Sequence, residues 1–257
     1  MEPMKRVVKL GGRAQSSAAL APAIAAAWNA SGALCVVHGG GDEISALQRR
    51  LGGEPRFAGG RRMTTAEDLA IIRMVLSGAV NKRLVSQFNA AGAPAVGISG
   101  EDASLISAQP LGIAEFGYVG MPASINAALI ESLWLAGYLP VISPVGANAE
   151  SPGTALNVNG DDAAAAISVA LGADELLLVA DVEGVLDSSG RLIPQMDVDE
   201  ARTLIASGVA AGGMAAKLEA AHAALAGGVR SVRIADIDAL ADTARGTLIT
   251  LVTVGAK

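Results

Sequence analysis

The chain alternates short apolar runs with longer stretches in which apolar residues recur at helical spacing. Runs such as "RVVKL" and "ALCVV" are rich in Val and Leu and predict buried strands. The predicted strands cover residues 6–10, 33–37, 94–98, 139–145, 175–181, 229–235 and 247–254. The predicted helices cover residues 16–30, 42–51, 65–90, 122–136, 161–171, 198–206 and 214–226. Residues 104–121 and 184–194 predict two hairpins, the second around a Ser-Ser-Gly turn.

This alternation predicts an α/β fold with a mainly parallel sheet that is covered by helices on both faces. Ligands of such sheets bind beyond the carboxyl ends of the strands. The segment "GADE" (172–175) marks a seam between two lobes, residues 1–172 and residues 173–257.

Composition narrows the class of protein. The chain has 257 residues, of which 51% are hydrophobic and only 3% aromatic, so the core is predicted to be aliphatic. A net charge of −6 without a basic stripe argues against a nucleic-acid partner. The single cysteine, Cys35, excludes disulfides and cysteine metal sites within one chain and favours a cytoplasmic location. Lys9 and Arg13 interrupt any signal peptide, and no segment qualifies as a membrane span.

The stretch "VVHGGGD" (36–42) places three glycines where a strand passes into a helix. Glycine permits positive φ and leaves backbone N–H groups uncovered. A strand, a glycine turn and a helix N-terminus together make an anion site. An ordinary tight turn explains three glycines equally well, so the rest of the chain has to decide.

Three charged residues occupy positions suited to phosphate chemistry. Lys9 ends the first strand before Gly11 and Gly12, and Lys217 follows a glycine pair that opens a helix. A cation near a helix N-terminus opposes the helix dipole, which an anion nearby would correct. Asp161 starts an alanine-rich helix. Each has an ordinary alternative: a snorkelling lysine, an exposed helix lysine and a helix cap.

Three further polar residues are candidates for ligand binding. Arg62 precedes Thr64 and Glu67, which have capping-box spacing, so Arg62 is expected beside a helix N-terminus where a carboxylate could bind. Asn157 lies in "NVNG", which also reads as a turn. Asp181 closes a strand, where an acid suits a polar ligand or merely caps the turn.

The sequence lacks the residues that several classes of enzyme require. Only two histidines occur, so a histidine metal site is not expected. The sequence has no Gly-x-Ser-x-Gly elbow, no Walker A motif and no Gly-x-Gly-x-x-Gly after the first strand.

Nine segments, in order, resemble the amino acid kinase family, and within it the acetylglutamate kinases. They are "VVKLGG", "VVHGGGDEISALQRRLG", "GGRRMT", "VNKRLV", "AVGISGEDASLI", "GYLPVISPVG", "NVNGDDAA", "LLLVADVEGVL" and "GGMAAKLEAA". The resemblance implies an open αβα sandwich and transfer of a phosphoryl group from ATP to the side-chain carboxylate of N-acetyl-L-glutamate, a step of arginine biosynthesis. Mg²⁺ is expected to arrive with ATP rather than in a metal site of the protein.

The resemblance also implies a role for each candidate residue. Lys9 and Lys217 would flank the transferring phosphoryl group, and Asp161 would hold both lysines. Gly40, Gly41, Arg62 and Asn157 would bind acetylglutamate, with Arg62 on its α-carboxylate. The residues implied to bind ATP or its phosphates are Gly11, Gly12, Gly39, Asp181, Val182, Glu183, Gly184, Val185, Leu186, Val209, Ala210 and Ala211.

Some features depart from the family pattern. Arg61 stands where an apolar residue is usual, and its replacement by alanine is expected to be nearly silent. Asp42 and Glu43 place negative charge directly after the glycine turn. The chain lacks the extra N-terminal helix of arginine-inhibited members, which implies a homodimer insensitive to L-arginine. Two alternatives stay open: a sister kinase acting on a carrier-protein-bound aminoadipate or glutamate, and a non-catalytic amino acid or nucleotide sensor.

Overall fold

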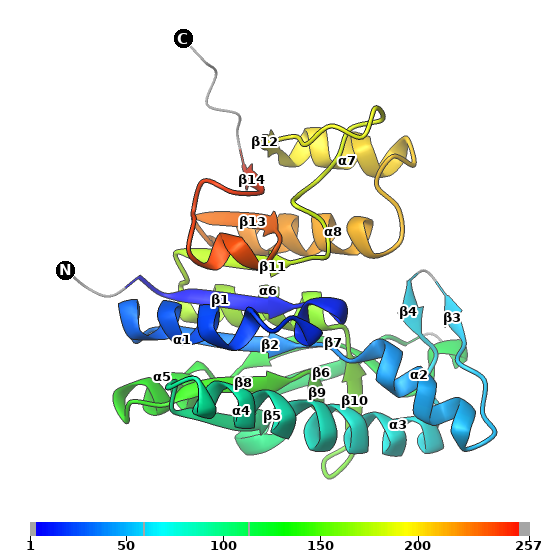
Figure 1. Ribbon diagram of the computed structural model, residues 1–257. Coiled ribbons are helices and arrows are strands. Elements are labelled where there is room, and N and C mark those ends of the chain that lie inside the picture. The colour runs from blue at the N-terminus through cyan, green and yellow to red at the C-terminus, as the bar shows by residue number, and fades with distance from the viewer. Residues whose placement is uncertain (1–3, 59, 113, 252–257) are drawn as a thin grey trace.

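A central sheet of eight strands organises the molecule (Figure 1). The computed structural model describes residues 4–58, 60–112 and 114–251. Along the sheet the strands are β12 (Gln195–Asp197), β14 (Thr247–Thr250), β13 (Ser231–Ala235), β11 (Glu175–Val179), β1 (Arg6–Leu10), β2 (Leu34–His38), β8 (Leu139–Ser143) and β5 (Ala95–Ser99). Every neighbouring pair is parallel except β13 with β14. The predicted mainly parallel sheet is therefore confirmed.

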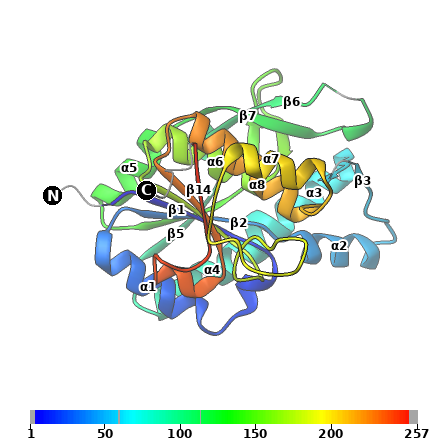
Figure 2. The same cartoon turned by 90° about the horizontal axis from the view of Figure 1, so that it is seen from above.

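Helices cover both faces of this sheet (Figure 2). One face carries α1 (Leu20–Ser31) and α4 (Asn81–Ala90), and the other carries α5 (Ala127–Leu135), α6 (Gly160–Leu171) and α8 (Gly213–Ala226). Helix α7 (Val198–Ala206) packs on α8. This is the expected αβα sandwich.

The central strands are buried along their whole length because helices cover both faces of the sheet. All five positions of β1, β2, β8 and β11 are buried. Successive side chains of a strand point to opposite faces. Accordingly Val7 and Cys35 belong to one hydrophobic cluster, and Val8 and Val36 belong to the cluster on the other face.

Four strands form a small closed barrel beside the sheet, and only two of them were predicted. They are β6 (Ile106–Pro110), β7 (Val119–Ile125), β9 (Val145–Asn148) and β10 (Ala155–Val158). The predicted hairpin is β6 with β7. The helix predicted from residue 122 was wrong at its start, because residues 122–125 pair with β6 and the helix begins at Ala127.

The N-terminal helix was also predicted too early. Residues Arg13–Ser16 form a short 3₁₀ turn, and α1 begins at Leu20. It ends before Gly32, whose φ of 66° stops the helix in the left-handed conformation.

The free edge of β5 is covered by side chains. Asn89 of α4 accepts a hydrogen bond from the N–H of Ala95 and donates one to its carbonyl. Lys82 donates to the carbonyl of Gly97, at 2.9 Å. An uncovered strand edge invites pairing with another chain, so these bonds protect the sheet.

The remaining elements gather beyond the carboxyl ends of β1 and β2 (Figure 1). They are α2 (Gly41–Arg50), a hairpin of β3 (Phe57–Ala58) and β4 (Arg61–Arg62), and α3 (Ala66–Arg73), which continues through a π-helical segment, Met74–Val80, into α4. A binding site is expected at this end of a parallel sheet. In the part of the chain that the structure describes, no helix is both long and apolar enough to cross a bilayer.

Candidate active site

Two lysines and one aspartate, far apart in the sequence, meet at the end of β1. Lys9 Nζ lies 3.0 Å from Asp161 Oδ1, and Lys217 Nζ lies 3.2 Å from the same oxygen and 3.3 Å from Oδ2. The side chains are 9%, 12% and 8% exposed for Lys9, Lys217 and Asp161. The arrangement concentrates positive charge in a partly desolvated place, because two ammonium groups share one carboxylate.

The pKa values of the cluster follow from burial and from its three charges. Burial alone would raise the pKa of Asp161, but the charges of Lys9 and Lys217 outweigh it and lower that pKa below its ordinary value. Burial lowers the pKa of Lys217, and the charge of Lys9 lowers it further, whereas Asp161 raises it. Asp161 therefore opposes the fall in the pKa of Lys217.

The start of α6 explains how Asp161 reaches both lysines. Asn159 caps this helix, and its side-chain oxygen accepts hydrogen bonds from the N–H groups of Asp161 and Asp162. Gly160 lies against Lys9, since a Cβ added there would be 3.2 Å from Lys9 Cε. A side chain at residue 160 would push Lys9 away from the carboxylate.

The glycine turn 39–41 lies beside this cluster, and Gly40 within it is needed for space rather than for positive φ. None of the three has a φ in the left-handed region, contrary to the expectation from sequence. A Cβ on Gly40 would lie 2.7 Å from Leu76 and 3.2 Å from Val80. A larger residue at Gly40 would therefore force the side chains of Leu76 and Val80 to shift.

Two glycine N–H groups expected at the phosphates take part in the sheet instead. Gly11 donates to the carbonyl of Val179 and Gly39 donates to that of Leu10, each at 3.2 Å. No residue that the structure describes accepts a hydrogen bond from the N–H of Gly40. The N–H of Gly41, the first residue of α2, also points out of a helix N-terminus that has no side-chain cap.

Arg62 lies at the N-terminus of α2, not at that of the helix following it in sequence. Its Nη2 donates to the carbonyl of Gly41 at 2.9 Å and to Ser45 Oγ at 2.8 Å, and its Nη1 donates to Gln48. The guanidinium also stacks 4.6 Å from the ring centre of Phe57. Gln48, in the last turn of α2, is buried and was missed as a site residue.

The predicted capping box is wrong by one residue. Thr65 and Asp68 form it at the start of α3, instead of Thr64 and Glu67. The hydroxyl of Thr64 instead donates to the carbonyl of Arg62 and accepts from Asn157 Nδ2, at 3.0 Å. The hydrogen bond that Asn157 donates to Thr64 links β10 to the strand end that carries Arg62.

The side chain of Arg61, next to Arg62 in the sequence, is paired and largely buried rather than free in solvent. Its Nη1 lies 2.6 Å from Asp162 Oδ2, and the pair joins the β3–β4 hairpin to the start of α6. Burial raises the pKa of Asp162, an effect that the charge of Arg61 partly offsets. The expectation that Arg61→Ala would be silent does not fit this position.

These residues line one pocket of about 200 Å³ at the carboxyl end of the sheet. Its walls are Lys9, Gly39, Gly40, Gly41, Ile44, Phe57, Gly60, Arg61, Arg62, Leu76, Val119, Pro144, Asn157, Val158, Asn159, Gly160 and Asp161. Cationic groups and uncovered N–H groups in one concave space suit a small anionic molecule. Asp42 and Glu43 do not oppose this, since both side chains are exposed or intermediate and Glu43 pairs with Arg83 at 2.7 Å.

The segments expected at the nucleotide lie on the other side of β1. Asp181 follows β11, and its carboxylate pairs with Arg13 at 2.8 Å. Val182 and Val209 are exposed, whereas Val185 and Ala210 are buried in the core. Among the other residues of the segments 181–186 and 209–211, Glu183 and Ala211 are exposed, Gly184 is buried and Leu186 is half-buried.

The described residues contain no group of three His, Cys, Asp or Glu side chains that could hold a metal ion. Both oxygens of Asp161 already contact ammonium groups.

Several known proteins are similar to this chain in sequence or in fold. The sequence pattern described as the amino acid kinase family matches residues 4–236. An acetylglutamate kinase of Paracoccus denitrificans is 50% identical over 201 residues, which are 78% of this chain and 66% of that relative. This chain thus spans just under two thirds of that relative's length. An acetylglutamate kinase of Methanopyrus kandleri is 43% identical over 223 residues, covering 83% of this chain and 89% of that one. The crystal structure of a Streptococcus mutans UA159 protein superposes with a TM-score of 0.87 at 31% identity, over 96% of this chain and 98% of that one.

Proposed function

Because the chain belongs to the amino acid kinase family, we propose that it is an acetylglutamate kinase. The reaction would move the γ-phosphoryl group of ATP to the side-chain carboxylate of N-acetyl-L-glutamate. The observation that carries this proposal is the cluster of Lys9, Asp161 and Lys217, in which Lys9 and Asp161 line an anion-suited pocket and Lys217 contacts Asp161. The similarity to acetylglutamate kinases supports N-acetyl-L-glutamate as the acceptor.

The chemistry needs no general base. A carboxylate with a pKa of about 4.3 is already ionised at neutral pH. The obstacle is electrostatic, because an anion has to approach the polyanionic end of ATP. Preorganised cations and N–H groups lower the barrier by stabilising the charge of the transition state.

The lysine cluster and the polar residues of the pocket then have distinct roles in this transfer. Lys9 and Lys217 stabilise the phosphoryl oxygens from two sides, and Asp161 holds both ammonium groups in place. Arg62 and Asn157 bind the acceptor away from the reacting carboxylate, with Arg62 on the α-carboxylate. Gly40 and Gly41 direct N–H groups at the anionic groups of the substrates.

The nucleotide is assigned to the C-terminal lobe. Residues 181–186 and 209–211 would line its site, with Gly11 and Gly12 near its phosphates and Gly39 supporting the glycine turn. The position of Gly11 supports this assignment, because its bond to Val179 places it at the end of β11. The division at residue 172 would then separate an acceptor lobe from a nucleotide lobe.

Magnesium would enter with ATP. Bound to the phosphates, Mg²⁺ would neutralise part of their charge. The donor set of the protein agrees with few direct ligands, since Asp161 serves the two lysines.

Turnover with N-acetyl-L-glutamate, aminoadipate and aspartate as acceptors tests this function. Release of ADP is expected with acetylglutamate and not with the other two acids. Turnover of aminoadipate alone would favour the sister kinase, and absence of turnover with every acceptor would favour a sensor. The similarity to acetylglutamate kinases favours neither alternative.

The Lys217→Ala variant ties that turnover to the proposed site. A large fall in kcat is expected, with a much smaller change in KM for either substrate, because the lysine acts mainly in the transition state. Lys217→Arg is expected to be poor as well, since a planar guanidinium does not replace a compact ammonium. Near-normal turnover of Lys217→Ala would refute the role assigned to Lys217.

We also infer a homodimer in the cytoplasm. Two large apolar side chains at the end of α5 are exposed, Leu135 at 90% and Tyr138 at 44%. A second copy of the chain would bury this apolar surface. Light scattering that reports a monomer would contradict the dimer.

A further inference from the structure

Two buried polar side chains behind the glycine turn have no role in the reaction as assigned. His38, the last residue of β2, is fully buried, and Gln15, in the 3₁₀ turn after β1, is 3% exposed. Both donate to the same acceptor. His38 Nδ1 lies 2.9 Å from the carbonyl oxygen of Gly39, and Gln15 Nε2 lies 3.1 Å from it.

The protonation of His38 is set by its surroundings. The Asn81 amide donates to His38 Nε2 at 3.1 Å and to the carbonyl of Val141 at 2.9 Å, so Nε2 is an acceptor and Nδ1 carries the proton. Burial lowers the pKa of His38 to about 4, which keeps the ring neutral. Nδ1–H is therefore a permanent donor to Gly39 at neutral pH.

These two bonds determine where the next N–H group points. The described residues contain no cis peptide bond, so the N–H of Gly40 points opposite to the carbonyl of Gly39. That carbonyl faces the interior, held there by His38 and Gln15. The N–H of Gly40 consequently faces the pocket that Gly39, Gly40 and Gly41 line.

We propose that Gln15 and His38 are positioning residues that lock the Gly39–Gly40 peptide, so that the N–H of Gly40 is aimed at the transferring phosphoryl group. This inference rests on the proposed function for the identity of the anion. Gln15 also links two loops, because its Nε2 lies 3.4 Å from the carbonyl of Leu10, next to Gly11. The Gln15 side chain thus connects the turn at Gly11 and Gly12 with the turn at 39–41, and both turns are expected near the phosphates.

A second observation separates positioning from a structural role. Gln15 Oε1 is buried and has no hydrogen-bond partner among the described residues. A buried unsatisfied acceptor destabilises a fold, and an apolar side chain of the same length removes it. The cost of this unsatisfied oxygen leaves the two hydrogen bonds that Gln15 donates as the contribution of its amide.

The test is Gln15→Met, with Gln109→Met as the matched control on an exposed strand position. We expect kcat with acetylglutamate and ATP to fall about 10-fold or more, because loss of one aligned oxyanion donor costs that much or more. KM for acetylglutamate should change less than about 3-fold, because the proposed target of this N–H is the transferring phosphoryl group, and the other acceptor contacts remain. The thermal midpoint should not fall. Gln109→Met should match the wild type in every measurement.

His38 offers a second pair of variants. An asparagine amide nitrogen can take the place of Nδ1, whereas a glutamine amide reaches toward Nε2. His38→Asn should therefore retain more kcat than His38→Gln, although both remove the ring. Equal kcat in the two variants would overturn the role of His38.

Amide hydrogen exchange measures the locked peptide directly and needs no turnover. Exchange in the segment 36–44 should be faster in Gln15→Met than in the wild type, and unchanged in Gln109→Met. An unchanged rate, or a fall in kcat that only follows a fall in thermal midpoint, would overturn the proposal. Failure of the proposed function would look different, since the wild type itself would lack acetylglutamate turnover.

Discussion

At the scale of single residues, Arg62 illustrates how one side chain serves binding and architecture together. Its guanidinium contacts Gly41, Ser45 and Gln48, all from α2, and it forms a wall of the pocket. The contact with Gly41 also holds the end of the glycine turn. Replacement of Arg62 is therefore expected to affect binding of the acceptor more than any other property.

Replacement of Arg62 by alanine is expected to raise KM for acetylglutamate about 30- to 150-fold. A charge-assisted bidentate pair with a carboxylate is worth roughly 2–3 kcal/mol, and it is made equally in the ground and transition states. KM for ATP should change little, because the nucleotide is assigned to the other lobe. Steady-state kinetics with each substrate varied in turn measures both constants.

The control for this experiment is Arg50→Ala, at an exposed position of α2, the helix that Arg62 contacts. Arg61 cannot serve, because it pairs with Asp162 at 2.6 Å. A similar rise in KM for both substrates would contradict a specific contact with acetylglutamate.

The Asp161→Asn variant tests the electrostatics of the lysine cluster through pH. The charge of Asp161 raises the pKa of Lys217 against burial and Lys9, which both lower it. Without that charge the pKa of Lys217 falls further, so the alkaline limb of the kcat profile should move to lower pH. The measurement is kcat against pH for both proteins, besides the expected loss of activity at neutral pH. An alkaline limb at the same pH would show that Asp161 does not control Lys217.

At the scale of elements, the edge strand β5 depends on the helix that precedes it. Asn89 satisfies both backbone groups of Ala95, and Lys82 satisfies the carbonyl of Gly97. The N–H of Ser99 donates to Asp102 at 2.6 Å. Side chains thus replace the missing neighbour strand along most of this edge.

Asn89→Ala is expected to lower the free energy of unfolding by about 1 kcal/mol, because two backbone groups lose their partners but water can reach them. Exposure of the edge should also increase aggregation on heating. Urea unfolding and light scattering during a thermal ramp measure the two effects. Gln87→Ala, exposed on the same helix, is the control and should leave both unchanged.

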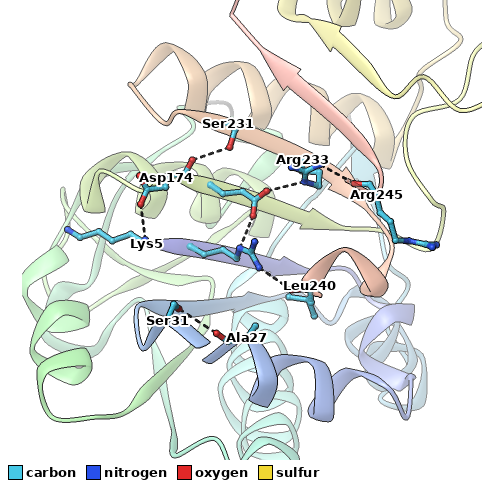
Figure 3. Close-up of polar contacts among 10 residues, drawn as sticks. Lys5, Ala27, Ser31, Asp174, Ser231, Arg233, Leu240 and Arg245 are labelled. Carbon is cyan, nitrogen blue, oxygen red and sulfur yellow. Dashed lines mark hydrogen bonds and ion pairs between the residues drawn. The ribbon is translucent and has the colours of Figure 1, made fainter. Parts of the chain in front are cut away.

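At the scale of the whole molecule, one sheet joins the two halves of the chain. β1, from the N-terminal half, pairs with β11 from the C-terminal half. A buried ion cluster reinforces this junction at the amino ends of the strands, opposite the site. Glu175 contacts Arg6 Nε at 2.7 Å and Arg233 Nε at 3.0 Å, and it is 2% exposed. Figure 3 shows the surrounding contacts, in which Arg233 reaches the backbone of Arg245.

Glu175→Ala is expected to lower the free energy of unfolding by about 3–5 kcal/mol, because it leaves Arg6 and Arg233 buried without their counter-ion. Chemical denaturation followed by circular dichroism measures this loss. The matched control is Glu131→Ala, which breaks an exposed pair with Lys5 and should cost below about 1 kcal/mol. Equal losses in both variants would contradict the importance of the buried cluster.

The sequence by itself determined the order and type of most elements. Apolar runs bounded by glycine and polar residues carry their own signal, so the parallel sheet and its covering helices followed from local pattern. It also indicated Lys9, Asp161 and Lys217, because each stands at the end of a predicted strand or the start of a predicted helix.

Only the tertiary structure decided how these elements meet. The pairing of Asp161 with both lysines, the contact of Arg62 with α2 and the strand at residues 122–125 depend on residues distant in sequence. The need for glycine at position 40 likewise comes from the close approach of Leu76 and Val80, and not from its own φ. Local periodicity records which face of an element is buried, but it carries no record of which neighbour buries it.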